Sequence, residues 1–165
     1  MNGPLEGIKI LEVGTMLAGP YATMMLADLG AEVIKIEPPE GDMMRQWPPI
    51  TEGAGGGYSE NFASINRNKR SIALDLKNPA HNKAARRLAL SADVVLENNR
   101  PGVMDRLGLG YESLARERPG LVYCSISAFG QSGPRSSEGG FDVTVQAMSG
   151  IMSVTGEAGG APVKC

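Results

Sequence analysis

Residues 8–37, IKILEVGTMLAGPYATMMLADLGAEVIKIE, decide the fold of this chain. Residues 8–13 form a mostly apolar run, which is typical of a short buried strand. A helical pattern follows, in which apolar side chains recur at the i, i+3, i+4 and i+7 positions: Ala22, Met25, Leu26 and Leu29. Gly30 ends the helix, and residues 33–37 supply a second strand that ends in an acid. The stretch therefore predicts a βαβ unit with a right-handed crossover.

The alternation of strands and helices continues through the rest of the chain. The expected strands lie at 71–76, 94–96 and 121–126, and the expected helices at 79–92, 103–107, 111–116 and 141–148. Asn78 and Pro79 start the first of these helices, because asparagine caps helices and proline fits their first turn. Two stretches, 38–64 and 130–140, are expected to be irregular. The pattern predicts the α/β class, with a Rossmann-like open, mostly parallel sheet and helices on both faces.

Composition limits the kinds of protein this chain can be. With 165 residues, 42% of them hydrophobic and 21% charged, it is long enough for one α/β domain. A net charge of -2 gives no broad basic surface, so no nucleic-acid partner is expected. No apolar run approaches the ~20 residues that span a bilayer, and residues 1–4 lack signal-peptide features, so we expect a cytoplasmic protein without a membrane partner. Two cysteines and one histidine, His81, predict no metal site and no Ser/His/Asp triad.

The turn after the first strand, residues 14–20, has the two-glycine spacing of a phosphate-binding Walker loop. Pro20 stands where such a loop carries its phosphate-gripping lysine, so a nucleoside triphosphatase is excluded. The turn also lacks the G-x-G-x-x-G pattern of dinucleotide sites. Glu37, however, is placed like the acid that holds a dinucleotide ribose, and a nicotinamide dinucleotide-binding module therefore remains an alternative.

Polar and cationic side chains gather where the third and fourth expected strands end. Lys77 follows the third strand, Asn98 and Asn99 follow the fourth, and Arg106 lies a few residues further on. Ligands of open α/β sheets bind beyond the carboxyl ends of the strands, so these residues suit a ligand with phosphates and a base or ribose. A solvated cationic face and a capped turn explain the same residues and stay open. Asp142 opens a helix, where the helix dipole stabilises a carboxylate whether or not it is catalytic.

Together these segments resemble the class III CoA-transferases, also called the L-carnitine dehydratase and bile acid-inducible protein F family. The resemblance runs from about residue 5 to residue 165. The motifs that carry it are LEGI (5–8), AGP (18–20), LGAEV (29–33), NKRSI (68–72), LDLK (74–77), RPGVM (100–104) and FGQ (129–131). Seven blocks in the right order and at the right spacing make the resemblance specific.

The resemblance implies an enzyme that transfers CoA from an acyl-CoA donor to a carboxylic acid acceptor. An aspartate of such enzymes attacks the thioester and forms anhydride and thioester intermediates, which divides one difficult exchange into easier steps. Coenzyme A or acyl-CoA is then a substrate, and no metal is implied. Carried over by position, the CoA contacts are Leu17, Ala18, Leu74, Asp75, Lys77, Asn98, Asn99 and Arg106. Asp142 would lie beside the acyl group as an accessory catalytic residue.

The resemblance also places the attacking aspartate just after Cys165. We therefore expect residues 1–165 to be the N-terminal CoA-binding part of a large domain, truncated, with the linker, the small domain and the C-terminal segment absent. Such a piece should bind without turnover. The longer parent is expected to be an interlocked homodimer. The alternative that is not an enzyme is a catalytically silent fragment that binds CoA or takes part in assembly.

Three positions depart from the family pattern. Phe141 stands where the α-methylacyl-CoA racemases carry an acid/base histidine, and because phenylalanine exchanges no proton, the racemase alternative is disfavoured. Pro38 replaces an arginine that several relatives place near CoA, and Asn99 replaces a common aromatic residue. Arg45 or Arg100 is the expected substitute for the missing adenosine contacts.

Overall fold

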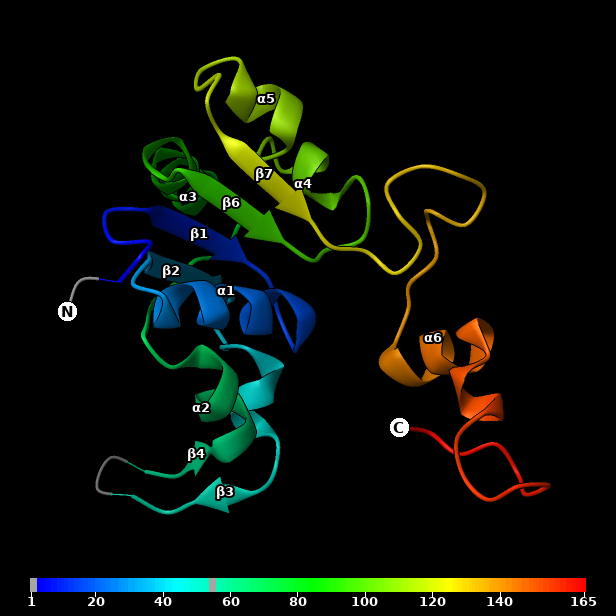
Figure 1. Ribbon diagram of the computed structural model, residues 1–165. Coiled ribbons are helices and arrows are strands. Elements are labelled where there is room, and N and C mark those ends of the chain that lie inside the picture. The colour runs from blue at the N-terminus through cyan, green and yellow to red at the C-terminus, as the bar shows by residue number, and fades with distance from the viewer. Residues whose placement is uncertain (1–2, 54–55) are drawn as a thin grey trace. The chain divides into compact units, whose positions relative to one another are not determined.

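The computed structural model describes residues 3–53 and 56–165, and the chain divides into two compact units at Ile126 (Figure 1). The first unit contains a five-stranded sheet in which every pairing is parallel and the strand order is β5-β2-β1-β6-β7. The strands are β1 Lys9–Val13, β2 Glu32–Glu37, β5 Lys69–Ala73, β6 Val94–Glu97 and β7 Val122–Ser125. The predicted Rossmann-like α/β class is confirmed.

The direction of chain progression reverses between β1 and β6. From β1 the chain moves through β2 to β5 at one edge, and then returns to β6 and β7 on the other side. Ile10 on β1 lies opposite both Val33 on β2 and Val94 on β6, so β1 is the central strand. Such a reversal leaves the loops at the carboxyl ends of adjacent strands diverging, which is where open α/β sheets hold their ligands.

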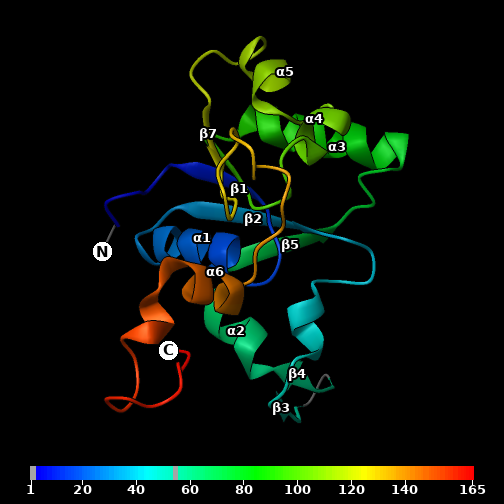
Figure 2. The same cartoon turned by 90° about the vertical axis from the view of Figure 1, so that its right-hand side faces the viewer.

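Helices cover both faces of the sheet (Figures 1 and 2). The helices of this unit are α1 Ala18–Asp28, α2 Glu60–Asn66, α3 Pro79–Ser91, α4 Val103–Arg106 and α5 Tyr111–Ala115. Successive side chains of a strand point to opposite faces, so β1 contributes Ile10 to a core with α1 and Leu11 to a larger core with α3, α4 and α5. The sheet therefore separates two hydrophobic cores.

Helix α1 is predicted correctly, but its apolar pattern does not mark its buried face. Met25 is 50% exposed and Leu29 is 46% exposed, while the buried residues are Gly19, Pro20, Thr23, Met24 and Ala27. These mostly small side chains let the helix lie close to the strands. The Thr23 hydroxyl on the same face donates a hydrogen bond to the Glu12 carboxylate on β1. Helix α3 starts as predicted, because the Asn78 side chain accepts hydrogen bonds from the amides of Ala80 and His81.

The segment 38–64, expected to be irregular, contains short elements. They are the 3-10 turn η1 Met43–Gln46, the antiparallel strands β3 Ile50–Thr51 and β4 Tyr58–Ser59, and helix α2. Asp42 caps η1, and the Ser59 hydroxyl caps α2 by accepting from the Phe62 amide. The third sheet strand also differs from its expected bounds of 71–76, since β5 lies at 69–73 and Leu74 turns away after donating to the Glu37 carbonyl.

The second unit, residues 127–165, contains helix α6 Asp142–Ser149 and the 3-10 turn η2 Ile151–Ser153. The helix expected at 141–148 is confirmed, and the stretch 130–140 is irregular as expected. None of the α6 residues is buried. Across residues 3–53 and 56–165, no helix combines the length and the apolar character needed to cross a membrane.

Candidate functional site

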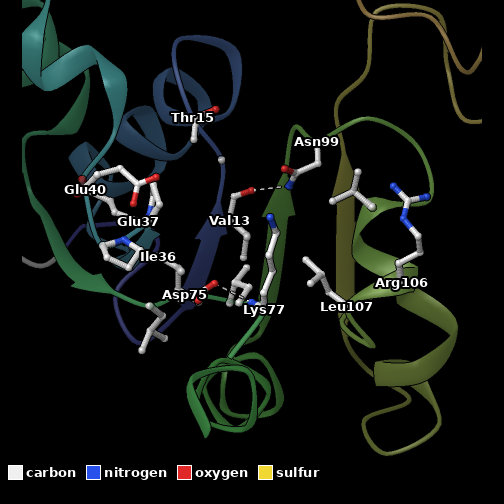
Figure 3. Close-up of a pocket in the computed structure, with 16 residues that line it drawn as sticks. Val13, Thr15, Ile36, Glu37, Glu40, Asp75, Lys77, Asn99, Arg106 and Leu107 are labelled. Atoms are coloured by element: carbon white, nitrogen blue, oxygen red, sulfur yellow. Dashed lines mark hydrogen bonds between the residues drawn. The ribbon is translucent and has the colours of Figure 1, made fainter. Parts of the chain in front are cut away.

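A cavity of about 660 Å³ opens at the carboxyl edge of the sheet (Figure 3). Four segments line it, and each lies at or beyond the carboxyl end of a different strand. They are residues 13–15 at β1, 36–40 at β2, 74–77 at β5, and Asn99, Val103, Arg106 and Leu107 beyond β6. All four segments belong to the first unit. A cavity of this size falls in the range of small-molecule and cofactor sites, ~300–1,000 Å³.

Apolar side chains make up much of the cavity lining. Val13, Ile36 and Leu74 come from the ends of three strands and belong to the core that faces α3. Val103 and Leu107 of the α4 region complete this apolar surface. An apolar surface beside a few polar groups suits a ligand that has a flat or aliphatic part and a charged part.

Two cations, Lys77 and Arg106, line the cavity. Lys77 comes from the segment after β5, and Arg106 projects from α4 (Figure 3). Among the described residues, neither the Lys77 ammonium nor the Arg106 guanidinium makes a hydrogen bond or an ion pair with protein. The turn that carries Lys77 is fixed, because its amide donates to Asp75 Oδ1 over 2.9 Å. Unpaired cations at the edge of a cavity attract an anionic ligand such as a phosphate.

The Glu37 carboxylate, which also lines the cavity, is fully engaged by protein donors. Arg45 donates to both oxygens over 2.6 and 2.7 Å, the Ser71 hydroxyl donates over 2.5 Å, and the Asp42 amide over 2.9 Å. Burial alone would raise the pKa of Glu37, but the donors outweigh it and lower the pKa to about 2. A carboxylate has about four acceptor positions, so none is left for a ribose hydroxyl. The geometry does not support the dinucleotide alternative.

The family model described as CoA-transferase family III matches residues 5–165. The chain belongs to this family. It is 48% identical to succinyl-CoA:glutarate CoA-transferase from Homo sapiens and 50% identical to succinate--glutarate CoA-transferase from Agrobacterium fabrum, in each case over 98% of this chain. It spans 36% and 41% of the length of these two relatives.

Two solved structures match the fold closely. A CAIB/BAIF family protein from Brucella suis superposes with a TM-score of 0.96 and 44% identity, covering 100% of this chain and 44% of that protein. Rv3272 from Mycobacterium tuberculosis superposes with a TM-score of 0.89 and 39% identity, covering 98% of this chain and 45% of that protein. The sheet and its helices are therefore those of CoA-transferase family III.

The structure brings five of the eight predicted CoA contacts of this family III chain into the cavity. These are Leu74, Asp75, Lys77, Asn99 and Arg106. Leu17, which is 56% exposed, and Ala18 lie at the start of α1 and do not line it. Asp142 lies in the second unit, where its carboxylate accepts from Gln146 Nε2 over 2.6 Å.

The side chains of Asn98 and Asn99 form hydrogen bonds with the protein backbone. The Asn98 side chain accepts from the Thr15 amide over 3.0 Å and donates to the Thr15 carbonyl over 2.9 Å, which joins the turn after β1 to the end of β6. A Cβ at Gly14 would lie 2.8 Å from Asn98 Oδ1, so glycine is required for this contact. Asn99 Nδ2 donates to the Val13 carbonyl over 3.0 Å (Figure 3).

Neither expected substitute for the missing arginine contributes a free cation to the cavity. Arg45 is held by Glu37, and its guanidinium lies 3.9 Å from the centre of the Phe62 ring. Arg100 does not line the cavity. Within the described ranges, no group of three or more His, Cys, Asp or Glu side chains is arranged to hold a metal ion.

Four buried charges that were not predicted from the sequence link β1, β2 and β5. Glu12, Lys35, Asp42 and Lys69 have side chains that are at most 2% exposed, and they pair with one another. Burial lowers the pKa of Lys69, an effect that the charge of Glu12 opposes. The signal was present in the sequence, because Glu12 and Lys35 are charged residues between apolar neighbours in β1 and β2.

Proposed function

We propose that this chain binds coenzyme A in the cavity at the carboxyl edge of the sheet, as the CoA-binding part of an enzyme that moves CoA from an acyl-CoA to a carboxylic acid. The observation that carries the proposal is the pair of cations Lys77 and Arg106, which lack a protein partner within residues 3–53 and 56–165 and lie beside an apolar surface. Membership of CoA-transferase family III supports the ligand class. Similar proteins named for the transfer of CoA between succinate and glutarate support the reaction class.

The two halves of the cavity suit the two halves of the ligand. The apolar side chains of Val13, Ile36 and Leu74 offer a surface for the adenine ring. Lys77 and Arg106 supply charge for the phosphates, to which an ammonium binds as a point charge and a guanidinium as a two-pronged donor. The Glu37 carboxylate is neutralised by Arg45, so it does not repel these phosphates in full.

We place the acyl chemistry outside the cavity itself. The proposal keeps Asp142 as an accessory residue near the acyl group and assigns the attack on the thioester to an aspartate that follows residue 165 in the longer parent. A polypeptide that contains residues 1–165 alone should, on this proposal, bind CoA and not exchange it. The proposed parent is a cytoplasmic, interlocked homodimer.

Isothermal titration calorimetry of this chain with CoA and with NAD tests the ligand. CoA should bind, and NAD should bind far more weakly, because Glu37 has no free acceptor for a ribose. Lys77→Ala and Arg106→Ala should each weaken CoA binding ~10-fold or more, the effect of losing one hydrogen bond to a charged group. Lys83→Ala is the matched control, since Lys83 is exposed on α3 and does not line the cavity.

Two results would overturn the proposal. One is the absence of CoA binding to the folded chain, and the other is an NAD affinity equal to that for CoA. An acyl-exchange assay addresses the chemistry separately. Exchange at the rate of a full-length family member would show that the chain contains its own nucleophile, and would remove the assignment of the attack to residues beyond 165.

A further inference from the structure

Four buried charges lie on the side of the sheet that faces α1. Glu12 projects from β1, Lys35 from β2, and Lys69 from β5, while Asp42 follows β2. Glu12 and Lys35 are direct partners in the parallel register. Two carboxylates and two ammonium groups balance in charge. Groups of this kind are costly to bury unless every one of them is paired, so their arrangement is tightly constrained.

The Lys35 ammonium makes two hydrogen bonds and one further ion pair. It donates to Glu12 Oε1 over 2.7 Å and to the Gly14 carbonyl over 2.7 Å, and it lies 3.0 Å from Asp42 Oδ2. The side chain of Lys35 is 1% exposed, so water does not compete for these contacts. The ammonium therefore joins the end of β1, through Glu12 and Gly14, to Asp42 in the loop after β2.

The contact between Lys35 and the Gly14 carbonyl holds one wall of the cavity, the turn after β1. Gly14 and Thr15 form the turn after β1 and line the cavity. Asn98 holds the peptide groups of Thr15, and Lys35 holds the carbonyl of Gly14. The turn is therefore fixed from β6 on one side and from β2 on the other.

The contact between Lys35 and Asp42 holds a second wall, the loop after β2. Residues 36–40 line the cavity, and the turn that closes this wall is made by the Gly41 amide donating to the Pro38 carbonyl and by the Asp42 amide donating to Glu37. Asp42 Oδ1 accepts from the Met44 amide over 3.0 Å. Asp42 Oδ2 is buried and accepts no hydrogen bond, and among the described residues its one ion pair is with the Lys35 ammonium.

We propose that Lys35 is a positioning residue that fixes the separation between the turn after β1 and the loop after β2, and thereby sets the width of the cavity for CoA. This inference rests on the proposed function. Lys35 itself does not line the cavity, so it acts through Gly14 and Asp42. Without it, Glu12 still accepts from Thr23 over 2.5 Å and from Lys69 over 2.8 Å, whereas the Gly14 carbonyl and Asp42 Oδ2 lose their link to each other.

Lys69 provides a matched comparison. Its ammonium is as buried as that of Lys35 and pairs with the same Glu12, but its other acceptors are the Pro20 carbonyl and Asn66 Oδ1, on α1 and α2. No acceptor of Lys69 lines the cavity. Lys69→Met and Lys35→Met therefore remove the same charge from the same network, and only the second severs the connection between the two walls.

The test measures CoA affinity by calorimetry and unfolding by urea for Lys35→Met, Lys69→Met and the double variant Lys35→Met/Asp42→Asn. Both single variants should be less stable than the unaltered chain. Lys35→Met should weaken CoA binding about tenfold or more, since small misplacements of a site are costly, while Lys69→Met should change it less than about twofold. The double variant removes the orphaned carboxylate as well. It should regain stability relative to Lys35→Met without regaining CoA affinity.

Amide hydrogen exchange gives a readout that does not depend on CoA. Exchange at Gly41 and Asp42 should accelerate in Lys35→Met and in the double variant, and should stay unchanged in Lys69→Met. Equal loss of affinity in the two single variants, or unchanged affinity and exchange in the double variant, would overturn the inference. If the unaltered chain fails to bind CoA while the exchange result holds, the proposed function fails and the positioning role of Lys35 stands.

Discussion

Acidification should release the wall of the cavity that Glu37 holds. Burial alone would raise the pKa of Glu37, but hydrogen bonds from Arg45, Ser71 and the Asp42 amide lower it from 4.5 to about 2. A carboxyl group whose folded pKa lies below its unfolded pKa stabilises the folded state only while it is ionised. The contribution of Glu37 is therefore complete above pH 4.5 and is lost as the pH falls toward 2.

The size of this contribution follows from the two pKa values. The difference between 4.5 and about 2 corresponds to ~3.4 kcal/mol, at ~1.36 kcal/mol for each unit of pKa. The Arg45 side chain, which supplies two of the donors, is 44% exposed, so solvent screens part of the interaction. We expect Glu37 to add about 2 kcal/mol to the free energy of unfolding near neutral pH, and most of this to be lost by about pH 2.5.

Urea denaturation of the unaltered chain and of Glu37→Gln, from about pH 6 to about pH 2.5, measures this contribution. Glutamine does not titrate, so the difference in unfolding free energy between the two proteins should shrink by about 2 kcal/mol as the pH falls. Glu138→Gln is the matched control, because Glu138 pairs with Arg135 on an exposed surface. A difference between the unaltered chain and Glu37→Gln that stays constant with pH would refute the reasoning.

Three further predictions concern single side chains. Asn98→Ala removes both bonds to Thr15, and should lower the free energy of unfolding by ~1–2 kcal/mol and weaken CoA binding; urea denaturation and calorimetry measure the two effects. Asn78→Ala removes the cap of α3, and should cost ~1 kcal/mol in a urea experiment without changing CoA affinity. Burial, with the nearby charges of Glu97 and Asp105, raises the pKa of Tyr123 above its usual range. In an alkaline absorbance titration, Tyr123→Phe should therefore remove the tyrosine that ionises at the highest pH. Loss of a tyrosine that ionises at lower pH would contradict this.

The order of the elements could be predicted from the sequence because it depends on neighbouring residues. The start of α3 at Pro79 follows from Asn78, and the end of α1 follows from Gly30, whose φ of +101° suits glycine. The gathering of Lys77 and Arg106 was also predictable, since the carboxyl ends of parallel strands share one edge of the sheet.

The parts that escaped prediction depend on contacts between distant segments. A lysine in an apolar strand, such as Lys35, can lie at an exposed edge or be buried beside an acidic partner. The strand register that places Lys35 opposite Glu12 is not visible in the sequence of either strand alone. Likewise, the apolar period of α1 through Met25 could not reveal that small residues and Thr23 would face the sheet. Helix α2 was hidden because its cap, Ser59, lies in a stretch rich in glycine and proline.

The paired charges beneath α1 also restrict how this protein can be recombined with its relatives. A chimera whose crossover point falls between Glu12 and Lys69 would take these paired charges from two different proteins. Any mismatch would strand a charge in the interior, at a cost of ~3–5 kcal/mol. Shuffled libraries of these enzymes should therefore exchange residues 12–69 as a single block.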